Sequence, residues 1–118
     1  MSPTTATIYH NARCSNSRGA LALLQERGIT PQVVDYLQQP LDAQQLAQLI
    51  AQLGVPVRDV MRSKEAIYQE LGLDDPTWSD AQLIGHIAAH PILLNRPIVV
   101  TGKGARLCRP PELVLELL

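Results

Sequence analysis

One of the two cysteines, Cys14, lies in a short polar stretch near the start of the chain, HNARCSNSR (residues 10–18). The apolar spacing that follows predicts a helix directly after this stretch, so the thiol would face unsatisfied backbone N–H groups and the positive end of the helix dipole. Both favour a thiolate over a thiol, and Arg13 and Arg18 add positive charge. The pattern predicts a redox-active cysteine rather than a thiol packed as a small hydrophobe.

The spacing Cys14-x-x-Ser17 limits the chemistry of this cysteine. A C-x-x-C pair would close an internal disulfide, but Ser17 has no thiol with which to resolve an intermediate. An outside thiol such as glutathione, or Cys108 if folding brings it close, would have to do so. Cys108 has the apolar neighbour Leu107, which favours a packed structural thiol over a resolving one.

Three arginines form a second group of candidates, Arg62, Arg96 and Arg109. The planar guanidinium offers a fork of donors that matches oxyanion geometry. Arg96 is expected at the entry to one strand and Arg109 at the end of the next, so a hairpin would bring both near the Cys14 loop. Any one of these arginines by itself is better explained by a surface ion pair. The prediction of an oxyanion pocket therefore rests on their joint placement.

Residue patterns predict the elements that position these side chains. Alternating and β-branched residues indicate strands at 5–10 and 32–37, separated by a helix over 17–27 that ends at Gly28. Capping boxes at Asp42 and Ser79 open helices that run to Gly54 and His90, with shorter helical pieces at 57–62 and 64–71 between them. A glycine-rich turn then joins strands at 98–100 and 105–107, and a last helix spans 111–118.

This order, β-α-β, a helical block, then β-β-α, is typical of a thioredoxin/glutaredoxin-like α/β fold with a helical insertion between its two halves, at about 41–90. In that fold a reactive cysteine sits at the N-terminus of the first helix, where the sequence puts Cys14. No repeat or low-complexity linker interrupts the chain. We therefore expect one domain, 1–118.

Composition excludes several classes of function. The net charge of −1, from ten Lys+Arg and eleven Asp+Glu, gives no basic surface for nucleic acid. The chain shows no leader and no long apolar stretch, so we expect a cytoplasmic protein without membrane contact. His86 and His90 have a metal-like i, i+4 spacing, but no further ligand cluster supports them, so we expect no metal site and no bound cofactor.

Three segments carry a resemblance to a known family: IYHNARC (8–14), HPILLNRPIVV (90–100) and RLCRP (106–110). Together they closely resemble the glutaredoxin-dependent arsenate reductases of bacteria, over essentially the whole chain. The Cys-Ser-x-Ser loop and the Arg-Pro-Pro-Glu motif, Arg109 to Glu112, are similar to those of a shorter, YfgD-like subgroup. Arg96-Pro97 also matches the cis-proline position of thioredoxin-like folds.

The resemblance implies an enzyme that reduces arsenate to arsenite. In such an enzyme Cys14 attacks arsenate, Arg62, Arg96 and Arg109 bind the oxyanion, and His10 supports the low pKa of the cysteine. Glutathione acts as co-substrate, and a glutaredoxin, bound transiently, reduces the resulting mixed disulfide. Arg13 departs from the pattern by adding a cation beside the thiol, which bears on substrate preference.

Two alternatives from the same fold stay open. A monothiol oxidoreductase would use Cys14 on another oxyanion or on glutathione mixed disulfides. A non-enzymatic domain that binds a partner protein would need neither a low thiol pKa nor convergent arginines. A related family of transcriptional regulators typically uses a C-x-x-C switch, which Ser17 excludes.

Overall fold

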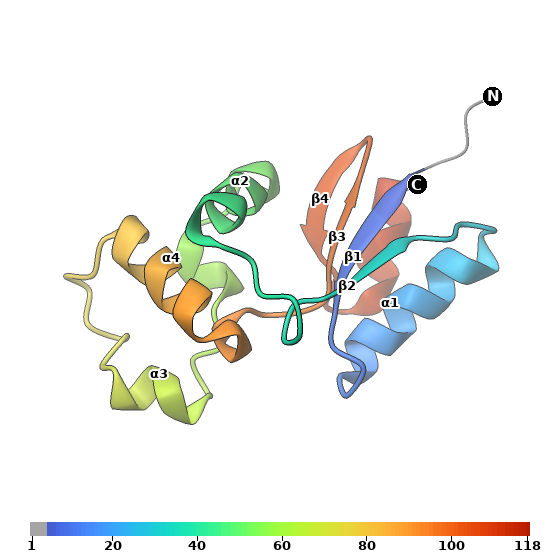
Figure 1. Cartoon of the computed structure of the whole chain (residues 1–118). Helices are drawn as coiled ribbons and strands as arrows, with labels where there is room; N and C mark the ends of the chain where they lie inside the picture. The colour runs from blue at the N-terminus through green and yellow to red at the C-terminus, as the bar shows by residue number, and fades with distance from the viewer. Residues whose placement is uncertain (1–4) are drawn as a thin grey trace. The chain divides into compact units, whose positions relative to one another are not determined.

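The computed structural model describes residues 5–118 and divides them into two compact units (Figure 1). The first unit joins the two ends of the chain, residues 5–39 and 96–118, and the second holds residues 40–95. The second unit therefore corresponds to the predicted helical insertion, extended at its C-terminal side by a short 3-10 turn, η2 (Pro91–Leu93). The assignment of the whole chain to one domain stays a prediction.

A four-stranded sheet forms the first unit, in the order β2-β1-β3-β4. The strands are β1 (Ala6–His10), β2 (Gln32–Asp35), β3 (Ile98–Thr101) and β4 (Gly104–Leu107). Strand β1 pairs parallel with β2 and antiparallel with β3, and β3 pairs antiparallel with β4 through the predicted hairpin. The end of β1 and the two ends of the hairpin carry the candidate site residues.

The helices α1 (Ser15–Glu26) and η3 (Pro111–Leu117) pack together on this sheet. Their shared core is buried and apolar: Ala6, Ile8, Ala20, Leu24, Val99, Cys108, Val114 and Leu117. A Cβ at Gly19 would lie 3.0 Å from the ring of Pro111, so the small glycine allows the chain after Arg109 to approach α1 closely. The last helix is a 3-10 helix, closed at its start by Leu113 N–H donating to the Pro110 carbonyl at 3.1 Å.

The second unit is helical, with α2 (Ala43–Leu53), η1 (Val57–Val60), α3 (Ala66–Glu70), α4 (Asp80–Ala89) and η2. Both predicted capping boxes are confirmed, Asp42 with Gln45 and Ser79 with Gln82. Gly54 ends α2 at φ 69°, a left-handed conformation that glycine adopts without steric cost.

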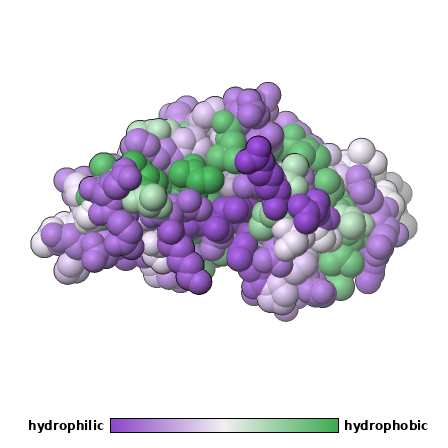
Figure 2. Space-filling view, turned by 90° about the horizontal axis from the view of Figure 1, so that it is seen from below, coloured by the Kyte–Doolittle hydropathy of each residue, from purple (hydrophilic) through white to green (hydrophobic). Residues whose placement is uncertain are grey.

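Figure 2 shows one face of the molecule, on which hydrophilic residues are interspersed with small hydrophobic patches. Among residues 5–118, no helix has both the length and the apolar character needed to cross a membrane.

Candidate active site

A tight turn after β1 brings Cys14 to the start of α1. The backbone N–H of Cys14 donates to the Asn11 carbonyl at 3.0 Å, and the Asn11 side-chain oxygen accepts from the N–H of Arg13 at 3.0 Å. Cys14 is the N-cap residue of α1, in extended conformation (φ −92°, ψ 123°). Its side chain therefore occupies the position from which a helix N-terminus binds negative charge.

The surroundings of the half-buried thiol lower its pKa from the usual value. Partial burial acts in the opposite direction and raises it, but the backbone N–H groups of Ser17 and Asn16 and the Arg96 guanidinium favour the thiolate and prevail. Nη1 of Arg109 also lies 3.7 Å from the Cys14 sulfur, within donating distance. The structure thus gives Cys14 the environment of a nucleophilic thiolate.

The β3–β4 hairpin brings Arg96 and Arg109 together beside this sulfur. Arg96 directly precedes the cis bond to Pro97 at the start of β3, and Arg109 follows β4, where Leu107 pairs with Ile98. Nη1 of Arg109 donates to the Arg96 carbonyl at 3.0 Å. Because the same nitrogen reaches the Cys14 sulfur, the two arginines and the thiol form one cluster that suits an oxyanion.

His10 ends β1 and is buried, and its Nδ1 lies 2.7 Å from the hydroxyl of Ser17. The same hydroxyl accepts from the N–H of Asn11 at 3.0 Å. Burial lowers the pKa of His10, Asp35 raises it and Arg18 lowers it, with a net decrease. The hydrogen bond of His10 thus goes to Ser17, whose own backbone N–H stabilises the thiolate. This contact was not expected from the sequence, in which Ser17 stood out only as a residue without a thiol.

Arg62, the third predicted arginine, belongs to the second unit. Its Nε makes an ion pair with Oε1 of Glu65 at 2.9 Å, and its Nη1 donates to the side chain of Asn95 at 3.3 Å. Its backbone N–H donates to the Leu93 carbonyl at 2.8 Å, next to the bridge between Met61 and Leu94. The partners in these three contacts, Glu65, Asn95 and Leu93, all belong to the second unit.

Cys108 lies in the core of the first unit with no exposed surface. Desolvation by burial raises the pKa of its thiol to about 11, although Arg106 acts in the opposite direction. A thiol with this pKa holds almost no thiolate at neutral pH, and a buried one is not reached by a partner. The expectation that Cys108 is a packed rather than a resolving thiol agrees with this environment.

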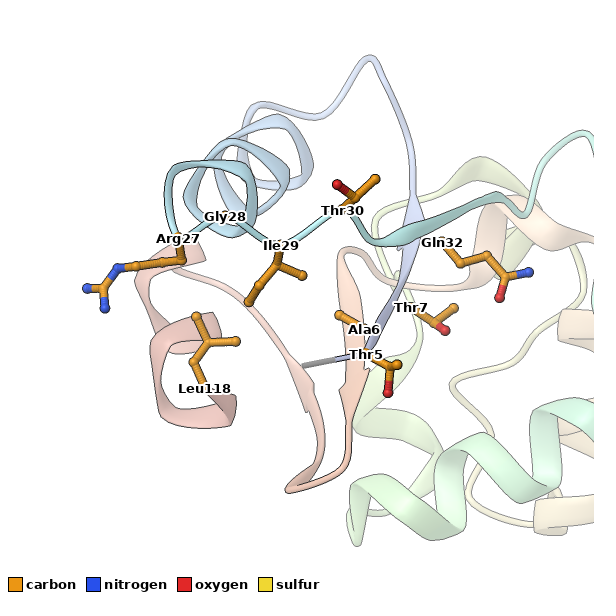
Figure 3. A pocket seen from close by; sticks show the side chains of 9 residues that line it. All are labelled: Thr5, Ala6, Thr7, Arg27, Gly28, Ile29, Thr30, Gln32 and Leu118. Carbon is orange, nitrogen blue, oxygen red and sulfur yellow. The ribbon is translucent and has the colours of Figure 1, made fainter. Parts of the chain in front are cut away.

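A pocket with a volume of about 760 Å³ opens beside the start of β1 (Figure 3), whereas Cys14 follows the end of that strand. It is lined by the start of β1, the residues after α1 and the C-terminal residue: Thr5, Ala6, Thr7, Arg27, Gly28, Ile29, Thr30, Gln32 and Leu118. None of the predicted site residues lines it. We therefore assign the chemistry to the Cys14 cluster and not to this pocket.

A thiol at the N-terminus of the first helix, beside a cis-proline and on a sheet of this order, is the arrangement of thioredoxin-like proteins, and this chain has that fold. Residues 9–117 match the ArsC family, and the chain belongs to it. An arsenate reductase of Yersinia enterocolitica is 50% identical over 95% of this chain and 79% of its own length. The uncharacterized protein YfgD of Escherichia coli is 50% identical over 93% of both chains, which confirms the predicted subgroup. A solved arsenate reductase from Vibrio cholerae is 48% identical, with a TM-score of 0.96 over 99% of this chain and 100% of its own.

The lowered pKa of Cys14 predicts its reactivity as a function of pH. Iodoacetamide reacts with thiolates, so the alkylation rate should rise and level off at a pH below that of an ordinary thiol, whose pKa is about 8.5. Peptide mass spectrometry resolves the two cysteines, and Cys108, with a pKa of about 11, should stay unmodified in the folded chain. A Cys14 rate that follows an ordinary thiol would show that Arg96 and the helix N-terminus do not activate it.

Proposed function

We propose that this chain reduces arsenate to arsenite, with glutathione as co-substrate and a glutaredoxin as the partner that regenerates the enzyme. The observation that carries the proposal is the cluster at the start of α1, in which the Cys14 sulfur has a lowered pKa and lies 3.7 Å from Arg109. Relatives that are about half identical and named arsenate reductases support arsenate as the oxyanion.

In the first step the Cys14 thiolate attacks the arsenic atom. A sulfur–arsenic bond forms, and one arsenate oxygen leaves as water after it gains protons. Arg96 and Arg109 offset the negative charge of the anion as it approaches a thiolate, since their guanidiniums already face the sulfur. No change of oxidation state occurs in this step.

In the second step glutathione brings the second thiol that the reduction needs. Its sulfur bonds to the Cys14 sulfur, the sulfur–arsenic bond breaks, and its electron pair remains on arsenic, which leaves as arsenite. The two thiols are thereby oxidised to a mixed disulfide. Ser17 has no thiol and Cys108 is buried, so an outside thiol is the natural partner. A glutaredoxin thiolate then takes the glutathionyl group and frees Cys14.

Two further residues have supporting roles in this proposal. His10 acts through Ser17, because its ring is hydrogen-bonded to the Ser17 hydroxyl at 2.7 Å, and this bond orients the helix turn that faces the thiolate. Arg62 is proposed as a third oxyanion ligand on the strength of the family resemblance. Substituting it separately tests that role.

A steady-state assay with arsenate, glutathione and a panel of glutaredoxins tests the proposal. We expect arsenite production that depends on all three, with clear differences in rate between glutaredoxins. If arsenate is not reduced while glutathionylated substrates are turned over, the chain is a monothiol oxidoreductase with another substrate. Turnover with glutathione alone at the full rate would remove the glutaredoxin from the proposed cycle.

A further inference from the structure

Arg13 is an exposed cation directly before the nucleophile, and its guanidinium is not engaged by the rest of the described chain. Within residues 5–118, the one hydrogen bond of Arg13 is made by its backbone N–H, to the Asn11 side chain at 3.0 Å. Neither ion pair among these residues includes it. Its charge is therefore available to a molecule that approaches Cys14.

The neighbouring arginines are engaged by the protein itself. Arg18 donates to the Ala12 carbonyl at 2.8 Å, and Arg109 donates to Cys14 and to the Arg96 carbonyl. The pKa of Cys14 is lowered by Arg96 and by backbone N–H groups, with Arg13 not among the causes. Arg13 therefore does not share the role of Arg96 in lowering the pKa of the Cys14 thiol.

The backbone that carries Arg13 is fixed, which makes its position useful for recognition. Two hydrogen bonds to Asn11 close the turn before Cys14: the backbone N–H of Arg13 donates to the Asn11 side chain and that of Cys14 to the Asn11 carbonyl, each at 3.0 Å. The loop HNARCSNSR contains no acidic residue that would neutralise the charge. A guanidinium carried on this backbone, one residue from a nucleophile, attracts anions that come to that nucleophile.

We propose that Arg13 binds a carboxylate of the thiol co-substrate, so that the site selects an anionic low-molecular-weight thiol over a neutral one. Glutathione fits this chemistry, with two carboxylates and one ammonium group. The planar guanidinium pairs with a carboxylate through two parallel hydrogen bonds. The inference rests on the proposed function, since it names how that function recognises its second substrate.

Thiol–disulfide exchange at Cys14 tests this recognition without arsenate or glutaredoxin. The Cys14 thiolate attacks one sulfur of oxidised glutathione, a new disulfide forms to Cys14, the old one breaks, and one glutathione leaves as thiolate. The second-order rate constant is measured for this anionic disulfide and for the uncharged bis(2-hydroxyethyl) disulfide. Mass spectrometry confirms that the adduct is on Cys14. Since no arsenate takes part, the result is independent of whether the chain reduces it.

The variants are Arg13→Gln and, as a matched control, Arg27→Gln. Arg27 is also exposed and makes no side-chain hydrogen bond within residues 5–118, but it caps the far end of the 12-residue helix α1, about 18 Å along its axis. We expect Arg13→Gln to lower the rate constant for oxidised glutathione about two- to fivefold, as for an exposed ion pair, and to leave the neutral disulfide unchanged. Arg27→Gln should change neither.

The preference of the natural chain for the anionic disulfide should also shrink as salt is added, because the Debye length falls from about 10 Å at 0.1 M to about 3 Å at 1 M. If Arg13→Gln lowered the rate constants for both disulfides equally, Arg13 would activate the Cys14 thiol and not recognise an anion, and the proposal would be overturned. The proposal would also be overturned if Arg13→Gln kept the full rate constant with both disulfides, or if Arg27→Gln lost as much rate with oxidised glutathione as Arg13→Gln.

Discussion

Replacing Cys14 by serine should abolish arsenate reduction, with a loss on the order of 10³-fold or more, because a hydroxyl at this position stays protonated and does not form the arsenic adduct. Removing the other thiol, in Cys108→Ala, should leave most of the activity. Cys108 is fully buried, and the pKa of its thiol is about 11. The initial rate of arsenite formation at saturating glutathione is the measurement.

Alanine is the better replacement at position 108, since it removes the thiol without burying a hydroxyl in the core of the first unit. Circular dichroism of both variants checks that they fold. Equal losses of activity in two folded variants would indicate an internal disulfide between Cys14 and Cys108. That outcome would remove glutathione from the resolving step.

Exchanging Arg96 or Arg109 for lysine should cost roughly 1–3 kcal/mol of transition-state binding, which is about 5- to 150-fold in kcat/KM. Lysine keeps the charge but loses the guanidinium fork. Arg109 uses one nitrogen for both the Cys14 sulfur and the Arg96 carbonyl, and Nε and Nη1 of Arg96 are buried. A single ammonium group does not reproduce these directions.

Arg106→Lys is the matched control for this pair of variants. Arg106 lies on the same hairpin, in β4, and its exposed side chain makes an ion pair with Glu116. We expect it to keep the rate of the natural chain. The alkylation of Cys14 should also persist in Arg96→Lys and Arg109→Lys, because backbone N–H groups contribute to its lowered pKa. Rates unchanged in both variants would refute the oxyanion pocket.

The elements whose signals are local were predicted well from the sequence. The two capping boxes and the stop of α2 at Gly54 depend on residues three or four positions apart, and all are confirmed. The placement of Arg96 and Arg109 beside Cys14 follows from a hairpin, so the order of the strands was enough to anticipate it. The capping boxes and the helix stop need no knowledge of distant packing, whereas the placement of the two arginines also requires β3 to pair with β1.

Features that depend on contacts between distant residues were predicted less well. The first helix begins at Ser15 and not at Ser17: the residue at the N-cap is Cys14, and the hydroxyl of Ser17, in the first turn, binds His10. Arg18, expected to add charge at the thiol, donates to the Ala12 carbonyl instead. A serine or arginine beside a helix start can satisfy several partners, and the sequence does not say which of them packing brings within reach.

A single-turnover experiment tests whether Cys14 reduces arsenate by forming a mixed disulfide with glutathione. The reduced chain is mixed with arsenate and glutathione in the absence of any glutaredoxin, and arsenite and the intact protein mass are followed together. We expect one arsenite per chain, formed at the same rate as a glutathionyl adduct on Cys14, after which the reaction stops until glutaredoxin is added. Arsenite formed without that adduct, or an adduct formed at the same rate when arsenate is left out, would contradict this mechanism.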